Sequence, residues 1–272
     1  MKKVVKLVGI LIVALGIFTS CKDDGNTIKI GIVGGFDNEE WDYVNEVLAP
    51  DGIKVELVRF SDYAAPNRAL NDGEIDLNSF QHKAFLANDI KQNGYELTAI
   101  GDTLIAPLAI YNNKKKISSI EDIKDGDKIA IPSDVTNGGR ALKLLEKAGI
   151  ITCDPSKGVI PTKVDITAYN KKIEIIEGES GTLANLLPDC AAAIINGGNA
   201  TVAGLSPNTD AIFVEDVDPN TNPAVLDLIN IIVTRTQDKD NPVYQKIVKA
   251  YQSDKVKEIV ESKFNGAYIC VW

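Results

Sequence analysis

Short apolar runs alternate along the chain with longer stretches in which apolar residues recur every three or four positions. An apolar run of this length is typical of a strand that helices cover on both faces, and the wider spacing predicts amphipathic helices. Strands are predicted at residues 27–33, 55–60, 74–77, 108–111, 128–131, 173–176, 191–195 and 229–233. Helices are predicted at residues 39–48, 63–70, 80–93, 243–251 and 256–264, with a short helix opened by a capping box at 118–121. This alternation predicts an α/β fold with largely parallel sheets.

The N-terminus has the three parts of a secretory signal. Residues 2–6 contain three lysines, residues 7–18 are uncharged and apolar, and Ser20 stands directly before Cys21. Because the apolar run is short for a membrane span, residues 1–20 are predicted to be a signal peptide. A small residue before a cysteine is typical of a lipobox, which predicts that Cys21 is diacylated, that residues 21–26 form the lipidated tether, and that the protein is an envelope lipoprotein facing outside the cytoplasm. The alternative is a plain secretory signal with an incidental cysteine.

Charge and length narrow the class of protein. The net charge is −9, and loss of the three signal lysines takes it to −12. An acidic surface repels phosphate backbones, which argues against nucleic acid as a partner. The roughly 250 residues that remain are enough for one large domain or for two lobes.

The reactive side chains indicate neither a metal site nor a cofactor. Cys153, Cys190 and Cys270 follow Cys21 without a CxxC spacing, so we expect three separate buried thiols, although an exported protein can also form one disulfide. His82 is the only histidine, which excludes a zinc site built from several histidines. No Walker-like loop is present, and no cofactor is predicted.

A strand, a turn and a helix follow one another at residues 128–148. The turn contains two glycines, and the first helical turn carries Asn137 and Arg140. A helix start has unpaired N–H groups and partial positive charge, so this segment predicts a site for an anion, most simply a carboxylate. The alternative is a solvated helix cap with a surface arginine.

Other polar or aromatic residues follow predicted strands, at the sheet edge where ligands bind in open α/β folds. They are Tyr63, Phe80, His82, Phe85 and Asn196. Asn230 lies within an apolar run, and a buried strand asparagine needs either backbone partners or a ligand. Each residue also has a structural explanation, as a turn residue, a helix-start histidine or a core aromatic.

The order of these segments resembles the NlpA/MetQ lipoproteins, the methionine-binding subunits of ABC importers. The similarity extends from Cys21 to Trp272. It rests on the segments 60–70 (FSDYAAPNRAL), 78–83 (NSFQHK), 131–142 (IPSDVTNGGRAL), 193–197 (AIING), 229–233 (INIIV) and 266–272 (GAYICVW). The chain departs from the family at Phe85, where the family has tyrosine, and at residues 198–200 (GNA), where it has Asn-Tyr-Ala.

The resemblance implies a two-lobed periplasmic-binding-protein clamshell, type II-like, in which two crossovers join the lobes. The first lobe would hold residues 27–106 and 224–272, and the second would hold residues 107–223. Such proteins close on a ligand by hinge motion and present it to a transporter.

The resemblance also implies a set of ligand contacts. Arg140 would pair with the ligand carboxylate, helped by Asn137, and a bidentate contact of this kind is strong. Asn196 and Asn230 would hold the amino and carboxylate groups. The side-chain pocket would be lined by Tyr63, Phe80, His82 and Phe85, and aromatic rings suit a thioether. The implied function is delivery of methionine, or a similar amino acid, to an ABC importer permease by a membrane-anchored lipoprotein.

Two other classes of function are alternatives to a solute-binding protein. An enzyme is not predicted, because the segment around His82 supplies no nucleophile with an orienting third group. The second is a lipid-anchored envelope or surface protein with a vestigial or altered ligand cleft and a role other than transport. A ligand titration discriminates between these classes.

Overall fold

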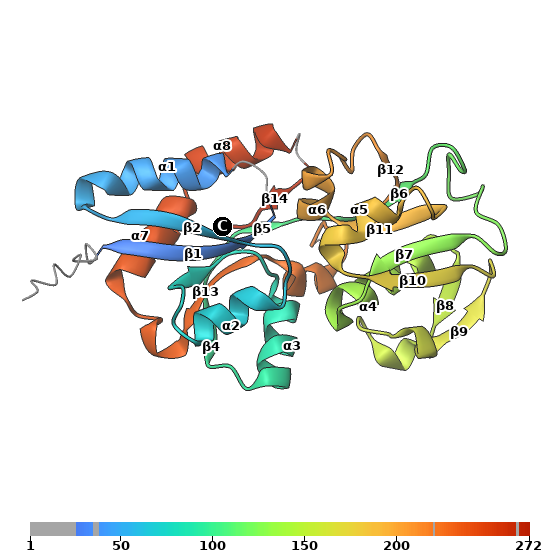
Figure 1. The fold of residues 1–272 in the computed structure, drawn as a ribbon, viewed down its shortest axis with the longest axis horizontal. Coiled ribbons are helices and arrows are strands. Elements are labelled where there is room, and N and C mark those ends of the chain that lie inside the picture. The colour runs from blue at the N-terminus through green and yellow to red at the C-terminus, as the bar shows by residue number, and fades with distance from the viewer. Residues whose placement is uncertain (1–25, 35–37, 220, 265–266) are drawn as a thin grey trace, which may run out of the picture.

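The structure is a computed structural model that describes residues 26–34, 38–219, 221–264 and 267–272. Its described strands form two five-stranded sheets and two small two-stranded sheets. The two large sheets lie side by side, each with its own helices (Figure 1). The first half contains the N-terminal strands and the C-terminal helices, and the second half contains the middle of the chain.

The first sheet has strands from both ends of the chain. Its order is β2 (Lys54–Phe60), β1 (Thr27–Val33), β3 (Leu77–Asn78), β13 (Ile231–Arg235) and β4 (Leu97–Asp102). β1 runs parallel to β2 and β3, whereas β13 runs antiparallel to β3 and β4.

Helices cover both faces of the first sheet. One hydrophobic cluster joins β1 and β2 to α1 (Glu39–Leu48), α7 (Pro242–Tyr251) and α8 (Asp254–Lys263). A second cluster joins the opposite face to α2 (Ala65–Asn71) and α3 (Lys83–Asn93). The three isoleucines of β1 all belong to the first cluster, whereas on the opposite face Lys29 is exposed and Gly31 is buried beside Ile75 and Phe60.

The second sheet is also covered on both faces, and the strand side chains on its two faces differ in size. Its order is β10 (Glu174–Gly178), β7 (Lys128–Pro132), β11 (Ala192–Asn196), β6 (Leu108–Asn112) and β12 (Ala211–Val214). Leucines and isoleucines of these strands pack on α4 (Val135–Lys147) and β8 (Ile151–Cys153). Alanines alternate with them and face α5 (Leu183–Leu186) and α6 (Gly197–Val202), so the short helices approach the sheet closely.

Two passages of the chain connect the halves. The first leads from β4 through β5 (Leu104–Ile105) into β6, and the second leads from β12 back to β13. β5 pairs with β14 (Ile269–Cys270), and β8 pairs with β9 (Ile166–Tyr169). The predicted two-lobed α/β class with two connections is confirmed.

Three expectations about the elements are wrong. The sheets are mixed rather than largely parallel, because β6 and β13 enter from the other half and run against their neighbours. No helix forms at residues 118–121, where the hydroxyl and N–H of Ser118 donate to Asp122 Oδ2 and close a turn. Asn230 is partly exposed and precedes β13, in an isolated bridge with His82.

The first strand, the first helix and the thiols can be compared with their predictions. The predicted strand at 27–33 and helix at 39–48 have the observed bounds, and Gly94 ends α3 with a φ of 72°. Cys153, Cys190 and Cys270 are free thiols, of which Cys270 is only partly buried. The predicted signal peptide and Cys21 lie outside the described residues.

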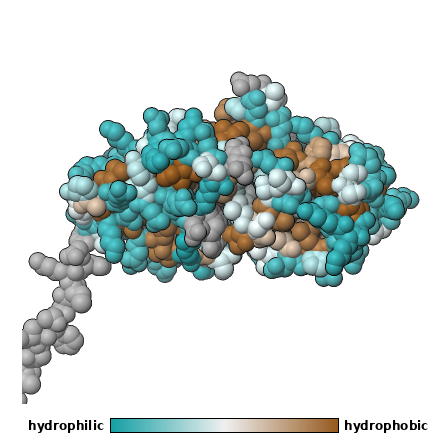
Figure 2. All heavy atoms as spheres, turned by 90° about the horizontal axis from the view of Figure 1, so that it is seen from above, coloured by the Kyte–Doolittle hydropathy of each residue, from teal (hydrophilic) through white to brown (hydrophobic). Residues whose placement is uncertain are grey.

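The surface is polar with separate apolar patches. Hydrophilic residues are interspersed with hydrophobic ones over the face seen in Figure 2. Within the described part of the chain, every helix is too short or too polar to cross a bilayer.

Candidate functional site

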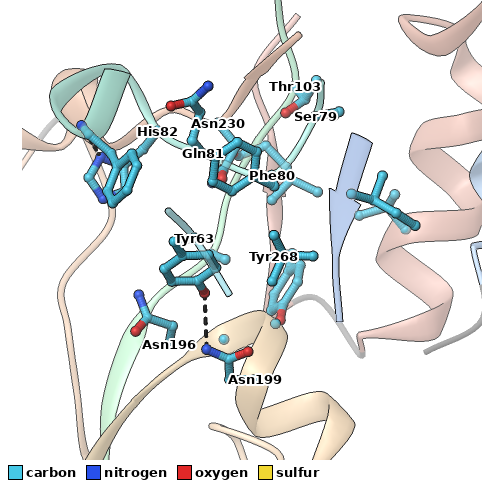
Figure 3. A pocket seen from close by; sticks show the side chains of 18 of the residues that line it. Tyr63, Ser79, Phe80, Gln81, His82, Thr103, Asn196, Asn199, Asn230 and Tyr268 are labelled. Carbon is cyan, nitrogen blue, oxygen red and sulfur yellow. Dashed lines mark hydrogen bonds between the residues drawn. The ribbon is translucent and has the colours of Figure 1, made fainter. Parts of the chain in front are cut away.

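One cavity brings together all eight residues that the sequence singled out. It has a volume of about 140 Å³ and lies between the two halves of the molecule. The first half contributes residues from the loops after β2 and β3, from α3 and from the segment before β13, and the second half contributes residues from α4 and the end of β11. Figure 3 labels five of them around a common space, namely Tyr63, Phe80, His82, Asn196 and Asn230. The eight residues are Tyr63, Phe80, His82, Phe85, Asn137, Arg140, Asn196 and Asn230.

The chain itself engages the N–H of Asn137 at the N-terminus of α4. Asp134 caps the helix, and its Oδ1 accepts the N–H of Asn137 at 2.9 Å. The same carboxylate accepts both contacts of the Asn137 side-chain amide nitrogen, at 3.1 Å. A carboxylate of the chain therefore lies at the helix start, where the sequence predicted a site for an anion.

Arg140 is buried, which excludes a surface arginine, but its fork is engaged. Its Nε donates to Glu215 Oε1 at 3.2 Å and its Nη2 donates to Glu215 Oε2 at 2.5 Å. Glu215 Oε2 also accepts the N–H of Leu108 at 2.9 Å, which fixes the ion pair to β6. A two-point contact of this fork with a ligand, as the sequence implied, would require displacement of Glu215. The remaining nitrogen, Nη1, donates to Asn137 Oδ1 at 3.3 Å.

Asn137 Oδ1 accepts hydrogen bonds from three donors. They are Arg140 Nη1, Asn196 Nδ2 at 2.8 Å and His82 Nε2 at 3.3 Å. The tautomer of His82 follows from its other nitrogen, because Nδ1 accepts the N–H of Phe85 at 3.1 Å and so carries no proton. The proton is on Nε2, which donates to Asn137. Asn137 thus positions three cavity residues, and its own polar atoms are already engaged.

His82 is neutral in this environment. Burial of the ring lowers its pKa to about 3, and the nearby charge of Arg140 acts in the same direction. The hydrogen bond with Asn137 opposes these effects without outweighing them. A neutral imidazole adds no positive charge to the cavity, so Arg140 is the cation that faces an anionic ligand group there.

The cavity contains an unpaired acceptor. Asn196 Oδ1 is buried and has no hydrogen-bond partner among the described residues, while its Nδ2 is held by Asn137. A buried carbonyl without a donor is costly and uncommon, which points to a donor supplied by a ligand. Asn230, on the other side of the cavity, donates through Nδ2 to Leu104 O at 3.1 Å.

Three aromatic rings form an apolar corner of the cavity. The centroids of Tyr63, Phe80 and Phe85 lie 5.9 to 6.0 Å from one another. His82 lies edge-on to Phe85 at 6.2 Å. Burial raises the pKa of Tyr63, so its hydroxyl stays protonated. This corner, which we call the aromatic corner, can accept an uncharged apolar group.

Some residues that line the cavity, or that hold a residue lining it, had no clear signal in the sequence. Glu215 lies far from Arg140 along the chain, and Tyr268 lines the cavity from the C-terminal segment. Asn199 Nδ2 donates to Tyr63 Oη at 3.0 Å, which joins the two halves across the cavity (Figure 3). The departure from the family at residues 198–200 was the only hint of Asn199.

The cavity also reaches α1, α7 and α8. Trp41 and Glu40 line it there, together with Tyr251. Burial raises the pKa of Glu40, whose carboxylate lies 3.8 Å from Lys263 Nζ. No cluster of three or more potential metal ligands occurs among the residues that the structure describes.

Known proteins of one family are similar to this chain over nearly its full length. The model of the NlpA lipoprotein family matches residues 28–272. The D-methionine-binding lipoprotein MetQ of Salmonella typhimurium is 42% identical over 270 residues, which cover 97% of this chain and 96% of that protein. Outer membrane lipoprotein 3 of Mannheimia haemolytica is 40% identical over 271 residues, with 99% and 100% coverage. A nutrient-binding protein of Burkholderia cenocepacia, solved with methionine bound, has a TM-score of 0.83 and 38% identity, covering 90% of this chain and 100% of that one.

Proposed function

The chain belongs to the NlpA lipoprotein family, and we propose on this basis that it is a solute-binding protein that delivers methionine, or a similar apolar amino acid, to an ABC importer. The observation that carries the proposal is the buried, unpaired Oδ1 of Asn196 in a cavity that also holds an arginine and an aromatic corner. A free amino acid supplies the three complementary groups, which are an ammonium donor, a carboxylate and a side chain.

Arg140 and the two asparagines would hold the head group of the ligand. The ammonium would donate to Asn196 Oδ1 and to the amide oxygen of Asn230. The carboxylate would accept from Arg140 Nη1, the guanidinium nitrogen that Glu215 does not engage. Because Glu215 already balances the charge of Arg140, the site favours a zwitterion over a simple carboxylic acid.

The aromatic corner would hold the side chain. A thioether packs favourably at ring edges about 5 Å away, and Tyr63, Phe80 and Phe85 present both faces and edges. His82 is uncharged, so it adds a flat, neutral wall rather than a second cation. Apolar amino acids of intermediate length fit this description better than charged ones.

The N-terminal sequence supports a lipid anchor. Acylation of Cys21 would tether the domain to an envelope membrane through residues 21–26, with the importer permease as the partner that receives the amino acid. Two acyl chains give stable anchoring, whereas one gives only marginal binding.

Analysis of co-purified ligand tests the proposal. The native protein is purified, denatured, and the released small molecules are identified by mass spectrometry. Calorimetry on the ligand-free protein then compares L-methionine, D-methionine and methionine amide, which lacks the carboxylate. We expect one amino acid per chain and much weaker binding of the amide. Failure of every amino acid to bind, with nothing released, would favour the alternative of an envelope protein with a vestigial or altered cleft.

A further inference from the structure

Four polar side chains form a hydrogen-bonded network close to the aromatic corner, and three of them are buried. Asn67 and Gln81 make a reciprocal amide pair, with Asn67 Nδ2 donating to Gln81 Oε1 at 2.8 Å and Gln81 Nε2 donating to Asn67 Oδ1 at 2.6 Å. Asn78 joins both, since its Nδ2 donates to Asn67 Oδ1 at 2.9 Å and its Oδ1 accepts from Gln81 Nε2 at 2.9 Å. Asn67 Nδ2 also donates to Asp89 Oδ2 at 2.8 Å. Asn67 and Asn78 are 0% exposed and Gln81 is 2% exposed.

The network connects the same three segments that supply the aromatic rings. Asn67 lies in α2, four residues after Tyr63. Asn78 is the last residue of β3, and Gln81 follows Phe80 in the loop between β3 and α3.

Asp89 is the network residue in α3, the segment that carries Phe85. It lies one helical turn after Phe85, and residues four apart in a helix share one face. Each ring of the aromatic corner therefore has a network residue in its own segment.

Backbone bonds fix the loop that carries Phe80 and the start of α3. Ser79 N–H donates to Gly31 O at 2.8 Å and Ile231 N–H donates to Gln81 O at 3.0 Å, so the loop is tied to β1 and β13. Lys83 N–H, at the start of α3, donates to Ile229 O at 3.1 Å. The position of α2 relative to this loop and to α3 has a further restraint. Side-chain bonds from Asn67 to Gln81 and Asp89 provide it.

Asn67 is the centre of this network because its amide is saturated. It donates twice through Nδ2 and accepts twice through Oδ1, which is the full capacity of the group. An aspartate at this position would lose both donors and face Asp89. A leucine of similar size would leave all of its partners in the buried network without their bonds to it.

We propose that Asn67 is a positioning residue that sets the spacing of Tyr63, Phe80 and Phe85, and that it thereby determines the side-chain selectivity of the amino-acid site. The inference rests on the proposed function, since it assigns the aromatic corner to the ligand side chain. Asn67 does not itself line the cavity. Its effect on the ligand is exerted through the rings.

The selectivity ratio of two ligands separates positioning from general stability. Calorimetry gives the ratio of the Kd of L-alanine to that of L-methionine for the native protein, for Asn67→Leu and for Asn78→Leu. The second variant removes two bonds of the network at a residue that, like Asn67, does not line the cavity. We expect this ratio to fall about tenfold in both variants, because methionine loses ring contacts that alanine never makes. Asn93→Ala is the matched control, since Asn93 bonds the other oxygen of Asp89 on the exposed side.

Several results would overturn the inference. Equal losses for both ligands, an unchanged ratio, or the same fall in Asn93→Ala would each reduce Asn67 to a structural residue. If Asn67→Leu does not fold, the ratio measured for Asn78→Leu decides. If the native protein binds no amino acid, the proposed function fails, and crystal structures of the variants test the positioning role separately. The ring spacing of 5.9 to 6.0 Å should then change by about 1 Å in Asn78→Leu and stay the same in Asn93→Ala.

Discussion

Asn199 and Tyr63 come from opposite halves of the molecule, and the amide of Asn199 donates to the hydroxyl of Tyr63 at 3.0 Å. Asn199 lies in α6, beside the second sheet, while Tyr63 follows β2 of the first sheet. The bond therefore crosses the cavity that holds the proposed ligand site. A hinge motion that separates the halves would break it.

Loss of this bond should weaken ligand binding. Tyr63→Phe and Asn199→Ala should each reduce methionine affinity by about fivefold, because the closed form loses one hydrogen bond worth about 1 kcal/mol. The double variant should be little worse than either single variant, since the two residues share one interaction. Calorimetry on the four proteins of this cycle measures the coupling, and Asn170→Ala, an exposed amide of the second half, is the control. Additive losses would show that the residues act independently.

Removal of Arg140 should cost both stability and binding. Arg140→Ala leaves Glu215, whose side chain is only 13% exposed, without its cation, which should lower the free energy of unfolding by about 3 kcal/mol. Adding Glu215→Gln, which keeps an acceptor for Leu108 N–H, should restore much of the stability without restoring binding. Urea unfolding and calorimetry measure the two effects separately. Native-like affinity in the double variant would exclude Arg140 from the head-group site.

Stability should fall in acid because His82 is buried neutral. Its pKa is about 3 in the folded protein and 6.5 in the unfolded chain, so between these values the unfolded state binds the extra proton. The free energy of unfolding should drop as pH falls through this window, by roughly 4 kcal/mol at pH 3 from this group. Urea unfolding of native protein and His82→Gln across pH isolates the effect, because the carboxylates titrate in both. Parallel pH profiles would mean that His82 is accessible to protons in the folded state.

Tryptophan fluorescence should report ligand binding through Trp41. This ring is 2% exposed, lines the cavity and lies 4.8 Å from Tyr251. Trp272 contacts the same tyrosine at 5.8 Å but does not line the cavity. Titration of methionine should therefore change emission in Trp272→Phe and leave it nearly constant in Trp41→Phe. The reverse pattern would place the ligand away from α1.

Lipidation of Cys21 should place the protein in the membrane fraction. The Cys21→Ser variant should lack the mass of the acyl chains and should lose stable anchoring, because a lipobox cysteine carries more than one chain. Intact mass measurement and membrane fractionation test this together. Identical masses and a soluble distribution for both proteins would support a plain secretory signal instead.

The linear pattern of the chain was enough to place many elements, and the resemblance of its motifs to a family selected the site residues among the candidates. The buried strand at 27–33 and the helix at 39–48 follow from apolar spacing, which is a local property. The eight candidate residues line one cavity because strand ends and helix starts meet at the same sheet edges. The order of short motifs further indicated the family.

The partners within the site were decided only by tertiary structure. Arg140 meets Glu215, and Asn67 meets Gln81 and Asp89, across separations along the chain that leave no periodic signal. The antiparallel direction of β6 and β13 also leaves no local signal. It depends on how the chain passes between the two sheets. Sequence patterns reflect which face of an element is buried, whereas charge pairing and amide networks depend on which elements the fold brings into contact.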